Sequence, residues 1–143
     1  MGGSKIFAIP FLFLCAPIIH SQEPTPTNLR TVDQFVAAFN SHDSSAMGEF
    51  VADDVAWLSV TGEDVIVETR GKSELASSMN AYFKSCPTCQ STLSGSISTP
   101  GRVSAVEITT WQGKTGTRSQ RSLSVYEFSE GLIHRVYYFP AEK

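Results

Sequence analysis

The residues between Arg118 and Pro140 constrain the fold more than any other part of the sequence. They form two runs rich in β-branched and aromatic side chains, joined by the turn residues Ser129-Glu130-Gly131. Two such runs around a turn that contains glycine predict a β-hairpin. Helix-like segments come earlier in the chain, so the order of patterns indicates a small cone-shaped α+β domain with a pocket.

Three segments carry apolar residues at helical spacing, and six carry strand-forming residues. Asp43 or Ser44 is expected to cap the second helix. The helical segments are expected at about residues 29–40, 44–50 and 73–83. The strands are expected at Val55–Val60, Val65–Thr69, Ser91–Ser98, Arg102–Trp111, Thr117–Phe128 and Leu132–Phe139. The predicted order is therefore ααββαββββ.

Residues 1–21 have the pattern of a secretory signal peptide. Lys5 precedes an uncharged apolar stretch, Ile6–Ile19, and a cleavage site is expected after Ser21. The apolar stretch is short for a membrane span and contains two prolines. The sequence therefore predicts an exported protein, periplasmic or secreted, that is not held in a membrane after cleavage.

The rest of the chain is expected to form one domain, residues 29–143, after a flexible lead-in at residues 22–28. The hydrophobic share of 41% and the aromatic share of 10% are those of a globular protein. Without Lys5 of the signal peptide, ten basic residues remain against 14 acidic ones, a formal net charge of −4. No basic stripe is present, which argues against a nucleic acid or a membrane surface as the partner.

The cysteines of the expected mature chain form one pair, Cys86-Pro87-Thr88-Cys89. An even number of cysteines in an exported protein favours a structural disulfide. A thioredoxin-type redox pair is an alternative, but its reactive thiol belongs at the start of a helix and this pair follows one. A zinc site is a second alternative, although it would need two further ligands and the mature chain offers only His42 and His134 as histidines.

Several short motifs resemble the start of the nuclear transport factor 2-like superfamily, which includes SnoaL-like polyketide cyclases and ketosteroid isomerase. These motifs are Phe35–Asn40 (FVAAFN), Asp43 and Phe50–Val55 (FVADDV), followed by Gly71 before the third helix. The resemblance covers Leu29–Phe139. It implies a strongly curved mixed or antiparallel sheet wrapped around a long N-terminal helix, with a pocket at the open end. Many members are dimers.

The resemblance also allows one activity to be tested residue by residue. Ketosteroid isomerase uses an aspartate base together with a tyrosine and a protonated aspartate that stabilise the enolate oxygen. The matching positions of this sequence hold Ser59, Phe35 and Ser124. A phenyl ring donates no hydrogen bond and a serine hydroxyl is a very weak base, so steroid-isomerase chemistry is not expected.

Strand alternation gives the candidate pocket residues, because every second side chain faces the same way. Glu107 and His134 are the candidate catalytic pair, since a carboxyl group in an apolar pocket can have its pKa raised toward neutrality. The candidate ligand-binding residues are Trp57, Ser59, Tyr82, Thr109, Ser124 and Tyr138. Two other interpretations of Glu107 remain open. It could be paired structurally with Arg118, Arg121 or His134, or it could lie on the outer face at a dimer interface.

The leading hypothesis is an exported domain that binds a small, partly apolar molecule without the ketosteroid isomerase mechanism. The rival is an isomerase, cyclase or dehydratase that needs no cofactor and moves protons with Glu107 and His134. A third hypothesis is an interaction module that binds another protein through its outer sheet face. No metal or cofactor is expected. A homodimer is expected to form through the outer face of the sheet, where Arg135, Tyr137 and Phe139 lie.

Overall fold

The order of helices and strands is the predicted one, ααββαββββ, and the fold class is confirmed. The computed structural model describes residues 26–141, so the expected signal peptide and most of the lead-in lie outside the described residues. The elements are α1 (Thr27–Asn40), α2 (Ser44–Gly48), β1 (Val51–Thr61), β2 (Asp64–Arg70), α3 (Lys72–Ser85), β3 (Gln90–Thr99), β4 (Arg102–Gly113), β5 (Gly116–Ser129) and β6 (Leu132–Phe139). None of the described helices is long and apolar enough to cross a bilayer.

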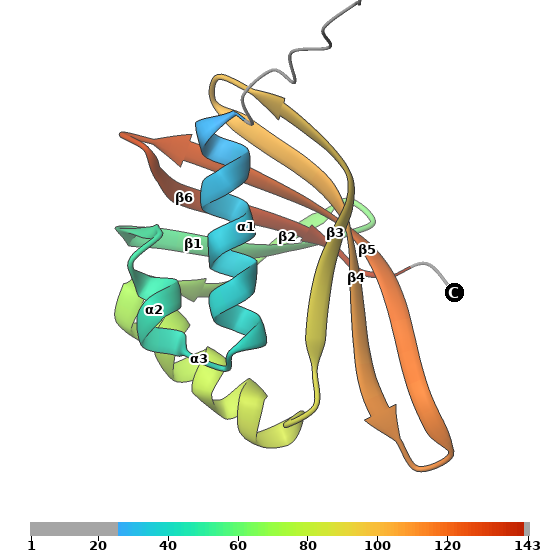
Figure 1. Ribbon diagram of the computed structural model, residues 1–143. Helices are drawn as coiled ribbons and strands as arrows, with labels where there is room; N and C mark the ends of the chain where they lie inside the picture. Colours follow the sequence, from blue (N-terminus) through green and yellow to red (C-terminus); the bar gives the residue numbers. More distant parts are fainter. Residues whose placement is uncertain (1–25, 142–143) are drawn as a thin grey trace, which may run out of the picture.

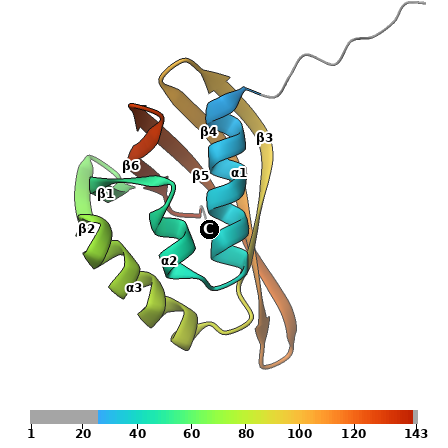
Figure 2. The ribbon, with the colours of Figure 1, turned by 60° about the vertical axis from the view of Figure 1, so that its left-hand side comes forward.

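The six strands form one mixed sheet in the order β2-β1-β6-β5-β4-β3. All neighbouring strands are antiparallel except β1 and β6, which run parallel. Figures 1 and 2 show the sheet curving around α1, with α2 and α3 beside the β1–β2 end. The last strand in the chain therefore occupies the interior of the sheet.

The core lies between α1 and the concave face of the sheet. On α1, Val32, Phe35 and Val36 are buried at the spacing that places side chains on one helical face. They meet fully buried strand residues, among them Ile133 and Val136 of β6. Burial of this apolar surface supplies the main favourable term for folding.

Two short sequence signals fix the connections around the helices. Asp43 caps α2, because its Oδ1 accepts a hydrogen bond of 2.9 Å from the backbone N–H of Ala46. Gly71 precedes α3 with a φ of 91°, a conformation that L side chains rarely adopt. Its N–H donates to the carbonyl oxygen of Val55 at 2.7 Å, which ties the start of α3 to β1.

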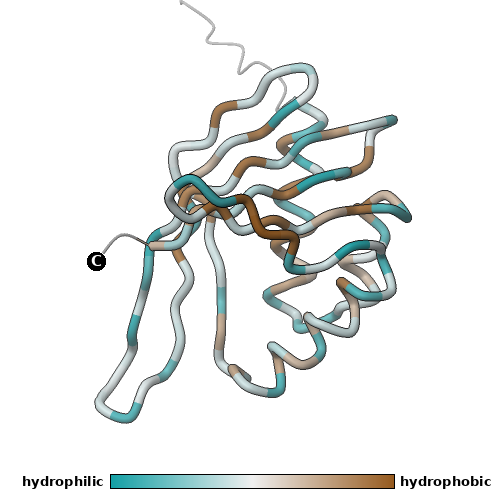
Figure 3. The backbone as a smooth tube through the Cα atoms, turned by 180° about the vertical axis from the view of Figure 1, so that it is seen from behind, coloured by the Kyte–Doolittle hydropathy of each residue, from teal (hydrophilic) through white to brown (hydrophobic). Residues whose placement is uncertain are grey.

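Apolar side chains are also exposed away from the helices. Val65, Ile66 and Val67 follow one another on the edge strand β2, and each is between 43% and 55% exposed. They form the continuous brown stretch that Figure 3 shows on the back of the molecule. On the outer face, Leu123 is 44% exposed and pairs across the strands with Val106 and Phe139.

Candidate ligand-binding cavity

A cavity of about 250 Å³ lies between the helices and the concave face of the sheet. The helices and the sheet both contribute to its wall. Residues of α1 and α3 lie on one side, and residues of β1, β4, β5 and β6 lie on the other. The lining residues are Phe35, Val36, Phe39, Trp57, Met79, Tyr82, Glu107, Thr109, Gln120, Tyr126 and Tyr138. Six of these eleven are aromatic, so the cavity is an apolar space with a small number of polar groups.

The aromatic rings form a connected wall around the cavity. The ring of Phe35 lies 6.4 Å from that of Trp57 and 6.2 Å from that of Tyr126, measured between centroids. Trp57 continues the wall to Tyr138 at 6.3 Å. On the helical side, Phe39 lies 5.8 Å from Tyr82. Aromatic pairs at these separations hold each other's orientation, which keeps the wall in place.

Glu107 of β4 is the one carboxylic acid among the lining residues. Its Oε1 accepts a hydrogen bond of 2.5 Å from the Ser91 hydroxyl, and its Oε2 accepts one of 3.3 Å from the Tyr126 hydroxyl. Both donors are about 1% exposed. The side chain is therefore held on both oxygens by groups that are themselves fixed in the core.

Burial and hydrogen bonding act on Glu107 in opposite directions. Removal from water raises the pKa of the carboxyl group, and the hydrogen bonds from Ser91 and Tyr126 lower it in part, with a net rise above the ordinary value. Burial, followed by the nearby Glu107 carboxylate, also raises the pKa of the Tyr126 phenol well above its usual range. The pKa of Tyr82 rises as well, first through burial and then through Tyr138 and Glu107.

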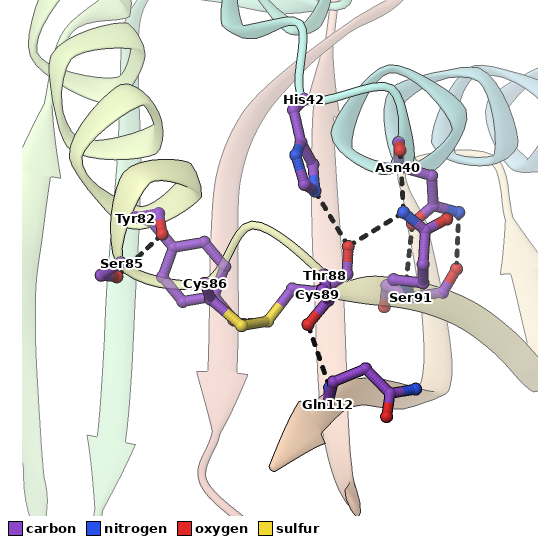
Figure 4. Close-up of a disulfide and its surroundings, with 10 residues drawn as sticks. Asn40, His42, Tyr82, Ser85, Cys86, Thr88, Cys89, Ser91 and Gln112 are labelled. Atoms are coloured by element: carbon purple, nitrogen blue, oxygen red, sulfur yellow. Dashed lines mark hydrogen bonds between the residues drawn. A yellow bond between two sulfur atoms is a disulfide. The ribbon is translucent and has the colours of Figure 1, made fainter. Parts of the chain in front are cut away.

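A disulfide between Cys86 and Cys89 closes the turn after α3, next to the cavity. The Tyr82 hydroxyl lies 3.3 Å from Sγ of Cys89, so a lining residue contacts the bond directly. His42 Nε2 lies 3.0 Å from the carbonyl oxygen of Cys89, which links the same turn to the end of α1 (Figure 4). Of the three interpretations of this pair, the structure contains the disulfide.

The family is decided by a comparison with known protein families. Residues 32–136 match the SnoaL-like domain, which is most of the described chain. The chain belongs to this family. A search of the curated proteins found no match.

Solved structures share the fold of this SnoaL-like domain. An uncharacterized cystatin-fold protein from Novosphingobium aromaticivorans is 23% identical, with a TM-score of 0.66 over 78% of this chain and 96% of that one. Rv0760c from Mycobacterium tuberculosis, solved in complex with estradiol-17beta-hemisuccinate, is 16% identical, with a TM-score of 0.65 over 78% and 92%. TerC, co-crystallized with polyporic acid, is 14% identical, with a TM-score of 0.66 over 80% and 92%.

The structure brings five of the eight candidate site residues of the SnoaL-like domain to the cavity: Trp57, Tyr82, Glu107, Thr109 and Tyr138. Ser124 faces inward but is fully buried, and its hydroxyl donates to the carbonyl oxygen of Ala105 at 3.4 Å. Ser59 is half-buried on β1, between Ile66 of β2 and Tyr138 of β6, and is not a lining residue.

The prediction that His134 stands beside Glu107 in the cavity is wrong. Phe128 of β5 pairs with Ile133 and Glu127 pairs with Arg135, so His134 is an extra residue in a β-bulge. The bulge breaks the alternation on which the prediction relied. His134 instead places its Nδ1 3.3 Å from Oδ1 of Asp54, outside the set of lining residues.

The structural pairing considered for Glu107 is also different from the one observed. Among residues 26–141, no salt bridge joins Glu107 to Arg118, Arg121 or His134. Its partners are the Ser91 and Tyr126 hydroxyls, neither of which was among the predicted site residues. Strand alternation through Ser124 could have found Tyr126, since the two lie on the same face of β5. No signal in the sequence indicates Ser91.

The described residues contain no group of three or more His, Cys, Asp or Glu side chains that could hold a metal ion. The lining residues carry one carboxyl group, three phenols, a threonine hydroxyl, a glutamine amide and the indole N–H of Trp57. This arrangement can orient a ligand by hydrogen bonds. It can also donate or accept a proton at Glu107.

Proposed function

We propose that this SnoaL-like domain binds a small, partly apolar molecule in the cavity between α1, α3 and the sheet. The observation that carries the proposal is a cavity of about 250 Å³, walled by six aromatic rings, in a domain of this size. Native interiors are close-packed, so an aromatic-lined space of this volume is a feature to be explained by a ligand. Rv0760c and TerC, which share the fold, were crystallised with small organic molecules.

Tryptophan fluorescence tests the binding proposal, because the two tryptophans lie in different places. Trp57 lines the cavity, whereas Trp111 lies on β4 and is not a lining residue. In a Trp111→Phe variant, a small aromatic ligand is expected to change the emission of Trp57 in a saturable manner. In the matched Trp57→Phe variant, the remaining Trp111 is expected not to respond. Equal responses of both variants would contradict binding in the cavity.

The alternative is a cofactor-independent isomerase, cyclase or dehydratase in which Glu107 moves a proton. The raised pKa of its carboxyl group supports this alternative, since a general acid or base works best near the ambient pH. Because His134 pairs with Asp54, Glu107 would act without the histidine of the predicted pair. If this alternative holds, Glu107→Gln lowers turnover by about 100-fold or more while ligand affinity changes little. Unchanged turnover would remove the catalytic role.

We also propose that the protein is exported after cleavage of residues 1–21. The Cys86–Cys89 disulfide supports this proposal, because structural disulfides persist mainly in oxidising compartments. Mass spectrometry of the protein recovered from outside the cytoplasm is expected to give a chain that begins at Gln22. Recovery of the full 143-residue chain in the cytoplasm would contradict the proposal.

A homodimer through the outer sheet face is a further proposal. Val106, Leu123 and Phe139 form one cross-strand row on that face, and they line an open hollow together with Arg121. Apolar side chains beside an arginine are typical of subunit interfaces.

A further inference from the structure

The charges around the cavity are unbalanced. Glu107 is the one acid among the eleven lining residues, and none of the eleven is a lysine, arginine or histidine. None of the salt bridges among residues 26–141 includes Glu107. A buried carboxylate is normally stabilised by a positive partner, and residues 26–141 supply none to Glu107 by a salt bridge.

The hydrogen bonds around Glu107 prepare it to act as an acceptor. Both oxygens already accept from hydroxyl groups, those of Ser91 and Tyr126. The Ser124 hydroxyl also acts on this carboxyl group, and an ionised carboxylate has room for about four hydrogen bonds, so acceptor capacity remains. Because Glu107 lines the cavity, this capacity is within reach of a ligand.

The rings around the carboxylate suit the same kind of ligand. Trp57, Tyr82 and Tyr138 line the cavity with Glu107, together with Phe35, Phe39 and Tyr126. The face of an aromatic ring carries partial negative charge and attracts a cation that comes within about 6 Å of its centroid. Several rings and one carboxylate around the same space are the groups that would attract an ammonium group.

From these three observations we propose that the cavity selects an organic cation, a small amine or quaternary ammonium compound with an apolar body. The ammonium group would lie against Glu107, and the apolar body would lie against the aromatic wall. The volume of about 250 Å³ is below the range of about 300–1,000 Å³ usual for drug-sized ligands, so the body is small. This inference rests on the proposed binding function and specifies the chemical class of the ligand.

Three probes with the same phenylpropyl body test the inference on the unmodified domain. They are 3-phenylpropylamine, 3-phenylpropanol and 3-phenylpropanoate, which near neutral pH are a cation, a neutral molecule and an anion. We expect the amine to bind about tenfold more tightly than the alcohol, and the anion to bind more weakly than both. Calorimetric titration gives the three affinities, and shifts in the NMR signals of Trp57 and Tyr82 locate the binding.

Variants then identify the group responsible for the preference. Glu107→Gln is expected to remove the advantage of the amine over the alcohol, so that the two affinities become equal within about a factor of two. Glu63→Gln is the matched control, because it removes the same charge from an exposed turn outside the cavity. If Glu107→Gln does not fold, the comparison of the three probes on the unmodified domain still decides the inference.

The two possible failures are distinguishable. Binding of the alcohol as tightly as the amine would overturn the cation inference and leave the proposed binding function standing. Absence of binding by all three probes would overturn the inference and count against the binding function as well. An amine preference that survives Glu107→Gln would also overturn the inference, because the preference would then come from another group.

Discussion

Two opposing effects act on the pKa of Glu107, and the balance between them can be measured. Burial in the aromatic cavity favours the protonated acid, whereas the Ser91 and Tyr126 hydroxyls favour the carboxylate. Burial is the larger effect, so the pKa of the folded protein is raised. A residue of this kind connects the stability of the fold to the pH of its surroundings.

The direction in which stability changes with pH gives a first prediction. Below the pKa of an unfolded glutamate both states are protonated, and burial of the neutral acid contributes its full stability. As the pH rises from there through the folded pKa, the unfolded state loses its proton first, so the free energy of unfolding falls. Urea unfolding across this window is expected to show the decrease in the natural protein and a smaller one in Glu107→Gln. Glu63→Gln, in an exposed turn, should retain the natural profile.

Identical profiles for the natural protein and Glu107→Gln would show that Glu107 titrates as it does in the unfolded chain. That result would contradict the raised pKa, and it would also weaken the case for proton transfer.

At the scale of single residues, the sequence predicted the side chains that follow regular alternation. Glu107, Thr109 and Tyr138 face the cavity as predicted because the pairing with β5 is uninterrupted at those positions. The prediction for His134 is wrong because β6 contains one extra residue at the bulge. Beyond an extra residue, each side chain of a strand points to the opposite face from the one that simple alternation predicts. A bulge depends on contacts between strands, so a local pattern does not reveal it.

At the scale of elements, the turn after α3 gives a second prediction. The Cys86–Cys89 disulfide closes a very short loop, for which the chain-entropy argument gives about 2 kcal/mol of stabilisation. Reduction is therefore expected to lower the free energy of unfolding by about that amount, measured by urea titration with and without a thiol reductant. The double variant Cys86→Ser/Cys89→Ser should not respond to the reductant. A response of the double variant would assign the effect to something other than this bond.

Strand β6 gives a third prediction, since it packs on both sides against other strands. Ile133 is fully buried in the core, and truncation to alanine is expected to cost about 2–5 kcal/mol in the free energy of unfolding. Ile97 on β3 is a matched control, because it is 66% exposed and the same truncation should change stability by less than about 0.5 kcal/mol. Similar losses for the two variants, in denaturant unfolding, would contradict the observed burial of β6.

The sequence predicted the type and order of the elements but not all their limits. β1 begins at Val51, four residues before the predicted Val55. The exposed Asp53 and Asp54 precede the predicted start, and they lie within the strand, at an irregular part of its pairing with β6. Charged residues occupy such positions because their side chains remain in water while the backbone continues the strand.

At the scale of the whole molecule, the outer face of the sheet gives a fourth prediction. If two copies associate through Val106, Leu123 and Phe139, an arginine in the middle of this row should separate them. Leu123→Arg is therefore expected to shift the protein from dimer to monomer in size-exclusion chromatography with light scattering. Ile97→Arg, an exposed site outside the row, should leave the mass unchanged. A natural protein that is already a monomer would contradict the proposed dimer.

The arrangement of the sheet could not be predicted from local patterns. Hairpin signals indicate that β5 and β6 are neighbours, but nothing local indicates that β6 also pairs in parallel with β1, which lies some 70 residues earlier. The resemblance to the superfamily predicts a curved mixed or antiparallel sheet, and the structure adds this particular pairing. The cavity depends on it, because it brings Trp57 of β1 next to Tyr138 of β6.

The interior position of β6 has a consequence for the newly made polypeptide. A ribosome releases β1 and β2 long before it releases β6. The apolar residues of this first hairpin therefore remain exposed until β6, which joins the hairpin to the other strands, has been synthesised. Assembly of the sheet is therefore delayed until nearly the whole chain has been synthesised, and a chain cut short before Leu132 would leave two unjoined sheet fragments. This delay is compatible with the proposed export, in which the polypeptide would cross a membrane before it folds.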